Sequence, residues 1–364
     1  MLQTLARASR VLALAGILTL ATIAEAAAIF GGQPAGPRAY PFMVSLLIKK
    51  AGSLFACGGT LIAEQWVLTA AHCLEGVTNP GDIRVFAGSD ERRNGDQIAA
   101  AQFWIHDGFN MELIDYDVAL IKLARAPAPG TSVSTIKLSA DPHRYADLPP
   151  GNDPTTEEGR RELIRATHRD VRVAGWGMTG PAKNTAPSAS LQVLQFRVAN
   201  NRYCEVRWTM TTLHILQSRL TSLGLSDAAV QDFLATALAS TPHSLPSGVI
   251  CASSSVDMLG DPVGSGILGE LFATGPVFPD RGGDPANFWT AMKKLAIDSE
   301  PGDCPGDSGG PVFATEADGS YVQVGIVSYG ASTTTMECGS TLAPSVYTSV
   351  AAYDAWIRSI MSGR

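Results

Sequence analysis

Short apolar runs, separated by glycines and charged residues, recur through the first part of the chain. They cover residues 42–48, 60–62, 66–68 and 83–87. Runs of this length, with turn-forming residues at near-regular spacing, are typical of strands in a β-sandwich or barrel. We therefore predict strands at these positions and an all-β fold.

Residues 139–170 interrupt this pattern. The stretch is rich in Pro, Asp, Arg and Glu and has little apolar periodicity before Val171. Turn formers at this density favour a linker with an extended loop, and residues 156–167 are a candidate short helix within it. A second β unit is expected to start near Val171.

Apolar residues at helical spacing occur in two places. The C-terminal stretch 350–360 has such a pattern and predicts a helix packed on the body of the protein. The other place is residues 213–238, where two apolar stripes predict a helical hairpin, with Ser226 as the N-cap of its second helix. The stripes are formed by Tyr353, Trp356, Ile357 and Ile360 near the C-terminus, and by Leu213, Leu216, Leu220, Val230, Phe233, Leu234, Ala237 and Leu238 in the hairpin.

The first 28 residues have the pattern of a secretory signal. Arg7 and Arg10 precede a mostly apolar run over 11–23, and Ala26–Ala28 supplies small residues for a cleavage site. A membrane anchor is the alternative, but the run is short for a span. We therefore expect a secreted or periplasmic protein with no membrane contact after removal of the signal.

Composition narrows the classes of function. The formal net charge of −7 argues against binding to nucleic acid or to anionic membranes. Six cysteines indicate an oxidising compartment, although spacing alone does not determine their pairing. The cysteines lack the close pairs that zinc sites use, so we expect no metal and no cofactor.

Candidate chemistry centres on residues 302–311, where Ser308 lies among glycines. Glycines permit close backbone approaches, so amide N–H groups could point together beside an exposed hydroxyl. A serine nucleophile needs that arrangement, although a Gly/Pro turn between strands is the plainer alternative. An α/β-hydrolase would need a histidine after the serine, and none of the six histidines lies beyond Ser308.

Two upstream segments supply a histidine and an aspartate. His72 lies in Thr69–Cys73 after an apolar run, and Asp117 opens the run 117–123. Alone, each is more often a structural residue. In this order, together with Ser308, they resemble the chymotrypsin/trypsin-like serine proteases. Further segments that match this family in its order are 29–32, 57–62, 175–177, 328–330 and 344–348.

The resemblance implies two six-stranded antiparallel β-barrels with the active site in the cleft between them, followed by a C-terminal helix. It divides 29–364 into a first barrel (29–138), a linker (139–170) and a second barrel (171–364). Two insertions, at about 205–250 and 252–300, depart from the family. The first contains the helical hairpin; the second is expected to be irregular over 260–283 and helical over 287–297. Both would border the cleft as a wall or lid, or be plain decoration or a dimer surface.

The family's roles carry over by position. Ser308 would be the nucleophile, His72 the general base and Asp117 the residue that orients it. The backbone N–H groups of Gly306 and Ser308 would form the oxyanion hole. The implied disulfides are Cys57–Cys73, Cys204–Cys251 and Cys304–Cys338.

The substrate pocket implied by the resemblance is less clear. Gly302 would lie at its base beside Asp303, and further substrate-binding residues would be Ser328, Gly330 and Ser345. Asp303 favours Lys or Arg at P1, with an aromatic or other apolar P1 as the alternative. Asp303 could instead turn outward or bond to nearby backbone.

In this family a new N-terminal amine pairs with the acid before the nucleophile, here Ile29 with Asp307. Because the predicted cleavage site Ala26–Ala28 directly precedes Ile29, we hypothesise that signal removal itself activates the enzyme. The expected function is a secreted serine endopeptidase acting on proteins or peptides, with a protein inhibitor as a further candidate partner. The alternatives are a non-catalytic homologue that acts as a binding module and a highly selective processing protease.

Overall fold

The computed structural model describes residues 29–111, 114–141, 170–199, 201–240, 248–254, 301–330, 338–339 and 344–363. Several predictions lie outside these residues. They are the signal sequence, the candidate helix 156–167 with most of the linker, and the irregular stretch and short helix expected at 260–283 and 287–297.

Six antiparallel strands close into a first barrel, in the order β2-β3-β4-β7-β6-β5. Every run predicted from the apolar pattern forms part of one of them, although Phe42 precedes the start of β2. Alternating side chains fill the interior, and the described core includes Leu46, Val67 and Ile121. The bounds are β2 (Met43–Lys50), β3 (Ser53–Ala63), β4 (Trp66–Thr69), β5 (Ile83–Ala87), β6 (Asp96–Ile105) and β7 (Ala119–Leu123).

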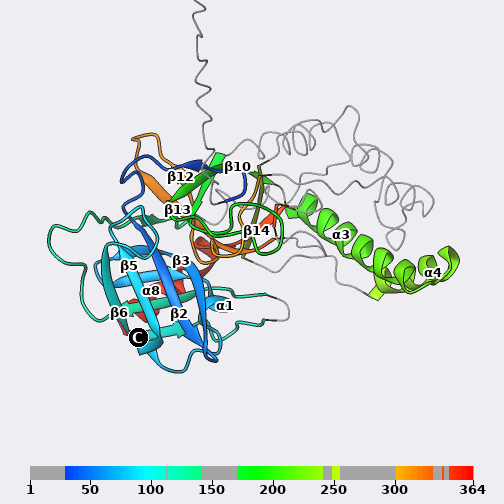
Figure 1. The fold of residues 1–364 in the computed structure, drawn as a ribbon, viewed down its shortest axis with the longest axis horizontal. Coiled ribbons are helices and arrows are strands. Elements are labelled where there is room, and N and C mark those ends of the chain that lie inside the picture. Colours follow the sequence, from blue (N-terminus) through cyan, green and yellow to red (C-terminus); the bar gives the residue numbers. More distant parts are fainter. Residues whose placement is uncertain are drawn as a thin grey trace, which may run out of the picture.

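A second ring of six antiparallel strands closes because β9 pairs with both β10 and β12. The remaining neighbours around the ring are β10–β11, β11–β14, β14–β13 and β13–β12. The two-barrel prediction is therefore confirmed (Figure 1). The bounds are β9 (Asp170–Gly175), β10 (Gln192–Ala199), β11 (Val249–Ser253), β12 (Pro311–Thr315), β13 (Tyr321–Tyr329) and β14 (Ser345–Ser349).

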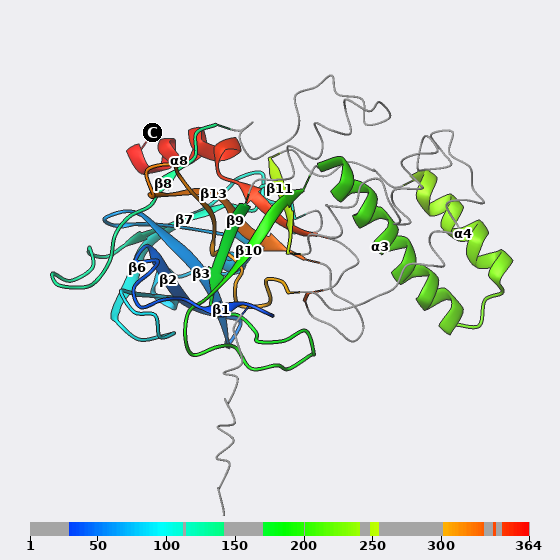
Figure 2. The same ribbon diagram turned by 90° about the horizontal axis from the view of Figure 1, so that it is seen from above.

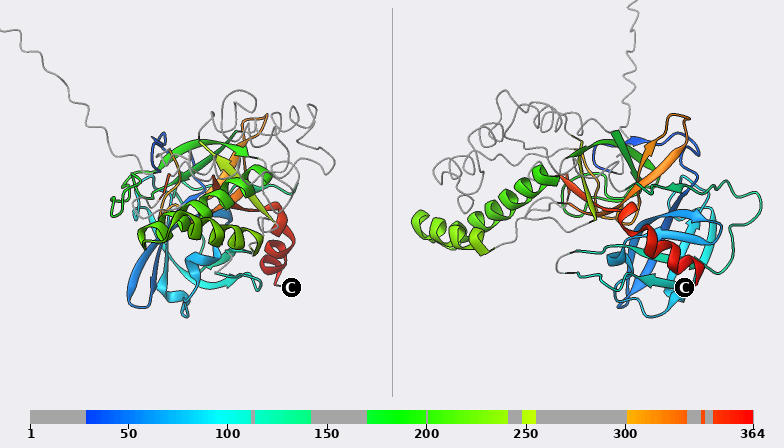
Figure 3. Two further views of the ribbon diagram at one scale, coloured as in Figure 1. Left: turned by 90° about the vertical axis from the view of Figure 1, so that its right-hand side faces the viewer. Right: turned by 180° about the vertical axis from the view of Figure 1, so that it is seen from behind.

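Segments at both ends of the first barrel's sequence belong to the second sheet. Strand β1 (Gln33–Pro34) pairs with β10, and β8 (Lys137–Leu138) pairs with β13. The C-terminus crosses the other way. The 3-10 turn η3 (Ala351–Tyr353) and helix α8 (Asp354–Ser362) pack on the core of the first barrel (Figure 3). This exchange of segments ties the two barrels together.

An aromatic cluster adds contacts where the chain enters the first barrel. Tyr40 and Phe42 lie just before β2 or at its start, and both rings contact Phe313 of β12, at centroid distances of 4.9 and 5.4 Å. Tyr321 of β13 completes the group, 5.5 Å from Tyr40. Tilted and edge-on aromatic pairs of this kind add stabilisation beyond their buried area.

The predicted helical hairpin is present as α3 (Asn201–Ser222) and α4 (Asp227–Ser240), which extend away from the two barrels (Figures 1 and 2). Helix α3 begins earlier than the apolar pattern indicated. Ser226 caps α4 as predicted, since its hydroxyl accepts the Ala229 N–H at 3.4 Å. Buried Leu213, Val230 and Leu234 come from the apolar faces of the two helices. Among the described residues, no helix is both long and apolar enough to cross a bilayer.

Three disulfides join Cys57 to Cys73, Cys204 to Cys251 and Cys304 to Cys338. All three predicted pairings are confirmed. The second bond fastens the first turn of α3 to β11, so the hairpin is covalently attached to the second barrel at its base.

Candidate active site

His72 and Asp117 meet at one edge of the first barrel because of strand register. Thr69 at the end of β4 pairs with Ala119 at the start of β7. The chain leaves β4 into the short helix α1 (Ala71–Leu74), which carries His72, and Asp117 lies just before β7. The His72 Nδ1 is 2.8 Å from Oδ2 of Asp117, and the His72 backbone N–H donates to Oδ1 at 2.9 Å.

Asp117 is almost completely buried and receives donors from both barrels. The Ser328 hydroxyl of β13 donates to its Oδ2 at 2.5 Å, and the Thr348 hydroxyl of β14 donates to its main-chain carbonyl at 3.0 Å. Burial by itself would raise the pKa of Asp117, but the hydrogen bonds and charge of His72, with the Ser328 hydroxyl, keep that pKa below its usual value. Asp117 therefore remains a carboxylate near neutral pH.

Ser308 lies next to this pair, on the loop before β12. Its carbonyl accepts the Gly58 N–H at 2.8 Å. The Cys73 Sγ lies 3.7 Å from the same carbonyl and 3.8 Å from Nε2 of His72. The structure thus brings together the three residues that the sequence placed far apart. Ser308 is partly exposed to solvent.

Close backbone contact makes this approach of the two barrels possible. A Cβ on Gly58 would lie 2.9 Å from Cα of Gly310. Gly309 has φ +78°, and a Cβ there would lie 2.7 Å from the Gly58 carbonyl oxygen. Only glycine combines this backbone conformation with so little space.

Two N–H groups of the Ser308 loop are available to a ligand. The N–H groups of Asp307, Gly309 and Gly310 donate to backbone carbonyls of Cys304, Val327 and Asp307. Within the described part of the chain, those of Gly306 and Ser308 have no such acceptor. Gly306 adopts φ +101°, which a side chain would disfavour.

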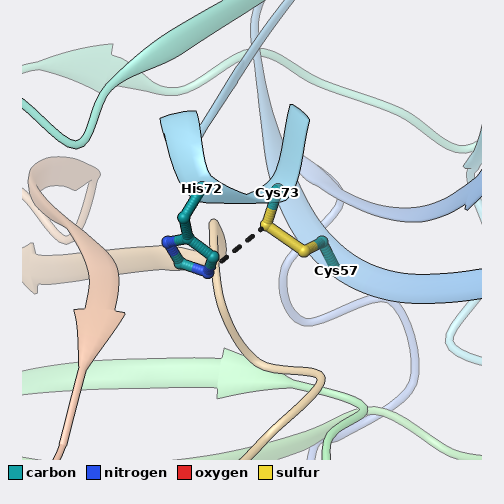
Figure 4. A group of neighbouring side chains, drawn as sticks. All are labelled: Cys57, His72 and Cys73. Atoms are coloured by element: carbon teal, nitrogen blue, oxygen red, sulfur yellow. Dashed lines mark hydrogen bonds between the residues drawn. A yellow bond between two sulfur atoms is a disulfide. The ribbon is translucent and has the colours of Figure 1, made fainter. Parts of the chain in front are cut away.

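Cys57, His72 and Cys73 form a group with the spacing of metal ligands, shown in Figure 4. The two sulfurs are bonded to each other, whereas coordination requires thiolates. The group is therefore a disulfide packed beside the imidazole, and it fixes α1 against β3.

Asp303 turns inward at the base of the predicted pocket. It is buried, and the Tyr347 hydroxyl donates to its Oδ1 at 2.9 Å. Burial raises the pKa of Asp303, and hydrogen bonds with Ser345 and Tyr347 partly oppose that shift. A Cβ on Gly330 would lie 3.7 Å from the Ser345 hydroxyl. Asp303, Ser345 and Gly330 therefore adjoin one another, and the outward-facing alternative for Asp303 is excluded.

The helical hairpin contacts the same pocket wall. The Trp208 ring of α3 packs edge-on against Tyr329 at a centroid distance of 5.3 Å, and its indole N–H donates to the Pro344 carbonyl at 3.1 Å. Tyr329 precedes Gly330, and Pro344 precedes Ser345. The base of α3 thus abuts two segments that carry predicted substrate-binding residues.

Asp307 occupies a closed site behind the Ser308 loop. Its Oδ1 accepts the Gly177 N–H at 2.7 Å and its Oδ2 accepts the Cys304 N–H at 3.0 Å. Burial nevertheless raises the pKa of Asp307 to about 7. Ile29 is buried in the core of the second barrel, and the Gly302 N–H donates to the Phe30 carbonyl at 2.9 Å. The N-terminal segment that contains Ile29 and Phe30 therefore lies beside Gly302, five residues before Asp307 in the sequence.

Comparison with known families agrees with this geometry. The sequence model of the Trypsin family matches residues 29–223 and 290–357, which is more than half of the chain. The chain belongs to the trypsin family. The unmatched residues 224–289 include α4 and most of the second predicted insertion, so the trypsin-family frame is interrupted there.

Individual relatives of this trypsin-family chain include two cathepsins G and a duodenase. Mouse (Mus musculus) cathepsin G is 33% identical over 186 residues, covering 50% of this chain and 61% of the relative. Bovine (Bos taurus) duodenase-1 is 32% identical over 202 residues, covering 54% and 70%. Human (Homo sapiens) cathepsin G is 31% identical over 187 residues, covering 51% and 63%. The chain thus spans less than two thirds of the cathepsins G that it matches.

Sequence reasoning missed two contacts of this trypsin-family site. Ser328 is predicted to bind substrate, and its hydroxyl also donates to Asp117, a contact that the sequence did not predict. Trp208 was not singled out, because an isolated tryptophan in a helical pattern gives no sign of its partner. The family-like segment 328–330 indicated that Ser328 lies near the site. The sequence of that segment does not indicate which group the Ser328 hydroxyl contacts.

The raised pKa of Asp307 predicts a pH-dependent stability for protein that begins at Ala27, where Ile29 has no free amine. A carboxyl that holds its proton more tightly when folded stabilises the fold fully below the unfolded pKa of about 4. That contribution is lost as pH rises to about 7. Urea unfolding at pH 5 and pH 8 should show a larger loss of stability for the wild type than for Asp307→Asn. The exposed Asp318→Asn should follow the wild type, and parallel losses in all three would contradict the prediction.

Proposed function

We propose that this protein is a secreted serine endopeptidase. The observation that carries the proposal is the hydrogen-bonded pair of His72 and buried, charged Asp117 beside the partly exposed Ser308. Membership of the trypsin family, which includes protein-cleaving enzymes, supports a protein or peptide substrate. The three disulfides support an oxidising compartment, secreted or periplasmic.

The proposed reaction uses His72 twice. A serine hydroxyl is a weak nucleophile until a base removes its proton. The Nε2 of His72 takes that proton while the Ser308 Oγ attacks the scissile carbonyl carbon. Asp117 accepts the Nδ1–H bond and stabilises the imidazolium that forms. The oxyanion is bound by the N–H groups of Gly306 and Ser308, whose freedom from backbone acceptors supports this role.

Collapse of the tetrahedral intermediate breaks the C–N bond. The leaving amine takes the proton from His72, and the acyl group stays on Ser308 as an ester. Water then attacks the ester carbonyl while His72 accepts a proton from it. Release of the carboxylic acid returns the proton to Ser308 and restores the starting state.

Cleavage of a mixed peptide library by protein that begins at Ile29, read by mass spectrometry, tests this function. Ser308→Ala should reduce the rate by at least about 10⁴-fold, because the nucleophile is lost. The exposed Ser362→Ala serves as a matched control and should cleave like the wild type. No Ser308-dependent cuts from folded protein would favour the non-catalytic binding homologue instead.

We further propose that the pocket prefers Lys or Arg at P1. The supporting feature is the inward carboxyl of Asp303, which has hydroxyl partners but no cationic partner among the described residues. A buried carboxylate without a counter-ion is costly, and a substrate ammonium or guanidinium would offset that cost. A substrate with an apolar P1 side chain would leave the charge of the Asp303 carboxylate without a counter-ion.

Replacing Asp303 by Ser tests the charge assignment. We expect kcat/KM for Lys and Arg substrates to fall by about 10- to 100-fold, since a charge-assisted hydrogen bond is lost. Values for aromatic P1 substrates should stay equal or rise. The exposed Asp318→Ser provides the matched control. An unchanged preference for Lys and Arg in Asp303→Ser would refute the assignment.

We also propose that the amine of Ile29, once freed, pairs with Asp307. Burial of Ile29 beside the Gly302 segment and the raised pKa of Asp307 support this pairing. An ammonium group there would stabilise the Asp307 carboxylate and so order the loop that carries Gly306 and Ser308. On this proposal, signal cleavage directly before Ile29 yields active protein.

Proteins that begin at Ile29 and at Ala27 should therefore differ in activity. We expect kcat/KM of the longer form to be lower by at least about 10-fold, in line with the several kcal/mol that a buried charge pair contributes. Asp307→Asn should remove the difference between the two forms. N-terminal sequencing of exported protein should give Ile29; a start at an earlier residue, or equal activity of the two forms, would refute the proposal.

A further inference from the structure

Lys50 lies at the end of β2, in the hairpin that β2 forms with β3. Its ammonium group reaches across to α1, where it donates to the carbonyl of His72 at 3.1 Å and to that of Cys73 at 3.4 Å. Nothing in the sequence pattern indicates this contact. It joins the β2–β3 hairpin to the turn that carries the predicted general base.

The short helix α1 needs such a donor. The carbonyl of Ala71 accepts the Glu75 N–H and that of Leu74 accepts the Val77 N–H, both at 3.0 Å. Within the described residues, no backbone N–H reaches the carbonyls of His72 or Cys73. Unpaired carbonyls at the end of a helix are stabilised by cations, which also interact favourably with the helix dipole. Lys50 meets both needs at once.

The hairpin also holds the ammonium group in place. The Nζ of Lys50 lies 4.9 Å from the ring centroid of Phe55, on the opposite strand. This is within the range of a cation–π interaction. Strand β3 continues from Phe55 to Gly58, whose N–H binds the Ser308 carbonyl. Strand β3 therefore makes two contacts: its Phe55 ring packs against the Lys50 ammonium group, and its Gly58 N–H binds the Ser308 carbonyl.

His72 is consequently held at both of its backbone polar groups. Its N–H donates to Asp117 Oδ1 at 2.9 Å, and its C=O accepts from Lys50. Because the N–H and the C=O of His72 are both hydrogen-bonded, the direction of its Cα–Cβ bond is restrained. The position of the imidazole ring is restrained with it. The helical turn closed by the Glu75 N–H and the Cys57–Cys73 disulfide also restrain this segment, and Lys50 adds the only hydrogen bonds among the described residues to the carbonyls of His72 and Cys73.

We propose that Lys50 is a positioning residue for His72, a role that rests on the proposed serine endopeptidase function. It touches neither the substrate nor the reacting atoms. It acts by holding the carbonyl of His72, and with it the backbone from which the imidazole extends. Small displacements of a catalytic group lower the rate steeply.

Lys50→Met tests the proposal against Lys49→Met as a matched control. Lys49 is the preceding residue and is exposed, and its side chain projects to the other face of β2. We expect kcat of Lys50→Met to fall about 10-fold with KM changed less than about 2-fold, by the cost of misplacing a base. Lys50→Arg, which keeps charge and donors, should recover most of kcat. Lys49→Met should match the wild type.

A second readout does not depend on activity. In proton NMR, the downfield signal of the His72 Nδ1–H bonded to Asp117 should shift or broaden in Lys50→Met and stay in place in Lys49→Met. Lys50→Gln, which removes the charge and shortens the side chain by one atom, should give the same change if Lys50→Met fails to fold. Phe55→Leu should move both readouts in the same direction by a smaller amount.

Three results would overturn the inference. They are an unchanged kcat and NMR signal in Lys50→Met, equal losses in Lys50→Met and Lys49→Met, and a loss that Lys50→Arg does not rescue. The proposed function can fail separately. If the wild type shows no Ser308-dependent cleavage, the endopeptidase function is refuted, and the NMR signal of His72 still decides whether Lys50 positions the imidazole.

Discussion

Burial of the Asp117 carboxylate is the constraint on which the rest of this structure depends. A desolvated charge is costly unless it is hydrogen-bonded, and removal of one partner from such a group typically costs several kcal/mol. Its donors come from α1 of the first barrel and from β13 of the second, and its own carbonyl is bonded from β14. No single barrel can satisfy this group. The hydrogen bonds that hold Asp117 in place are therefore complete only when the two barrels are correctly assembled.

Near Ser308 the two barrels meet through backbone contacts. A Cβ on Gly58 would lie 2.9 Å from Cα of Gly310, so the two backbones approach too closely for a side chain at Gly58. This proximity lets the Gly58 N–H bind the Ser308 carbonyl. Among the described residues, the N–H groups of Gly306 and Ser308 have no backbone acceptor. The aromatic cluster around Phe313 and the crossing of α8 onto the first barrel supply the apolar area that offsets such tight packing.

Two contacts from outside the barrel cores reach the site. Trp208 brings the α3–α4 hairpin, which projects from the second barrel, against Tyr329 and the Pro344 carbonyl. Lys50 brings the β2–β3 hairpin against the carbonyl of His72. Each of these elements is a hairpin that is attached to a barrel at its base. A two-barrel frame of this kind can therefore acquire new control over its site through its loops.

The sequence by itself determined the local features of this protein. The short apolar runs predicted the strands, helical spacing predicted α4, α8 and the cap at Ser226, and the glycines around Ser308 marked the candidate catalytic loop. It did not determine that the Ser328 hydroxyl bonds Asp117, that Asp303 turns inward, or that Lys50 and Trp208 reach the site. Ser328 and Asp117 are 211 residues apart. Periodicity and turn chemistry act over a few residues, whereas the direction of a buried polar side chain is decided by the partners that folding brings to it.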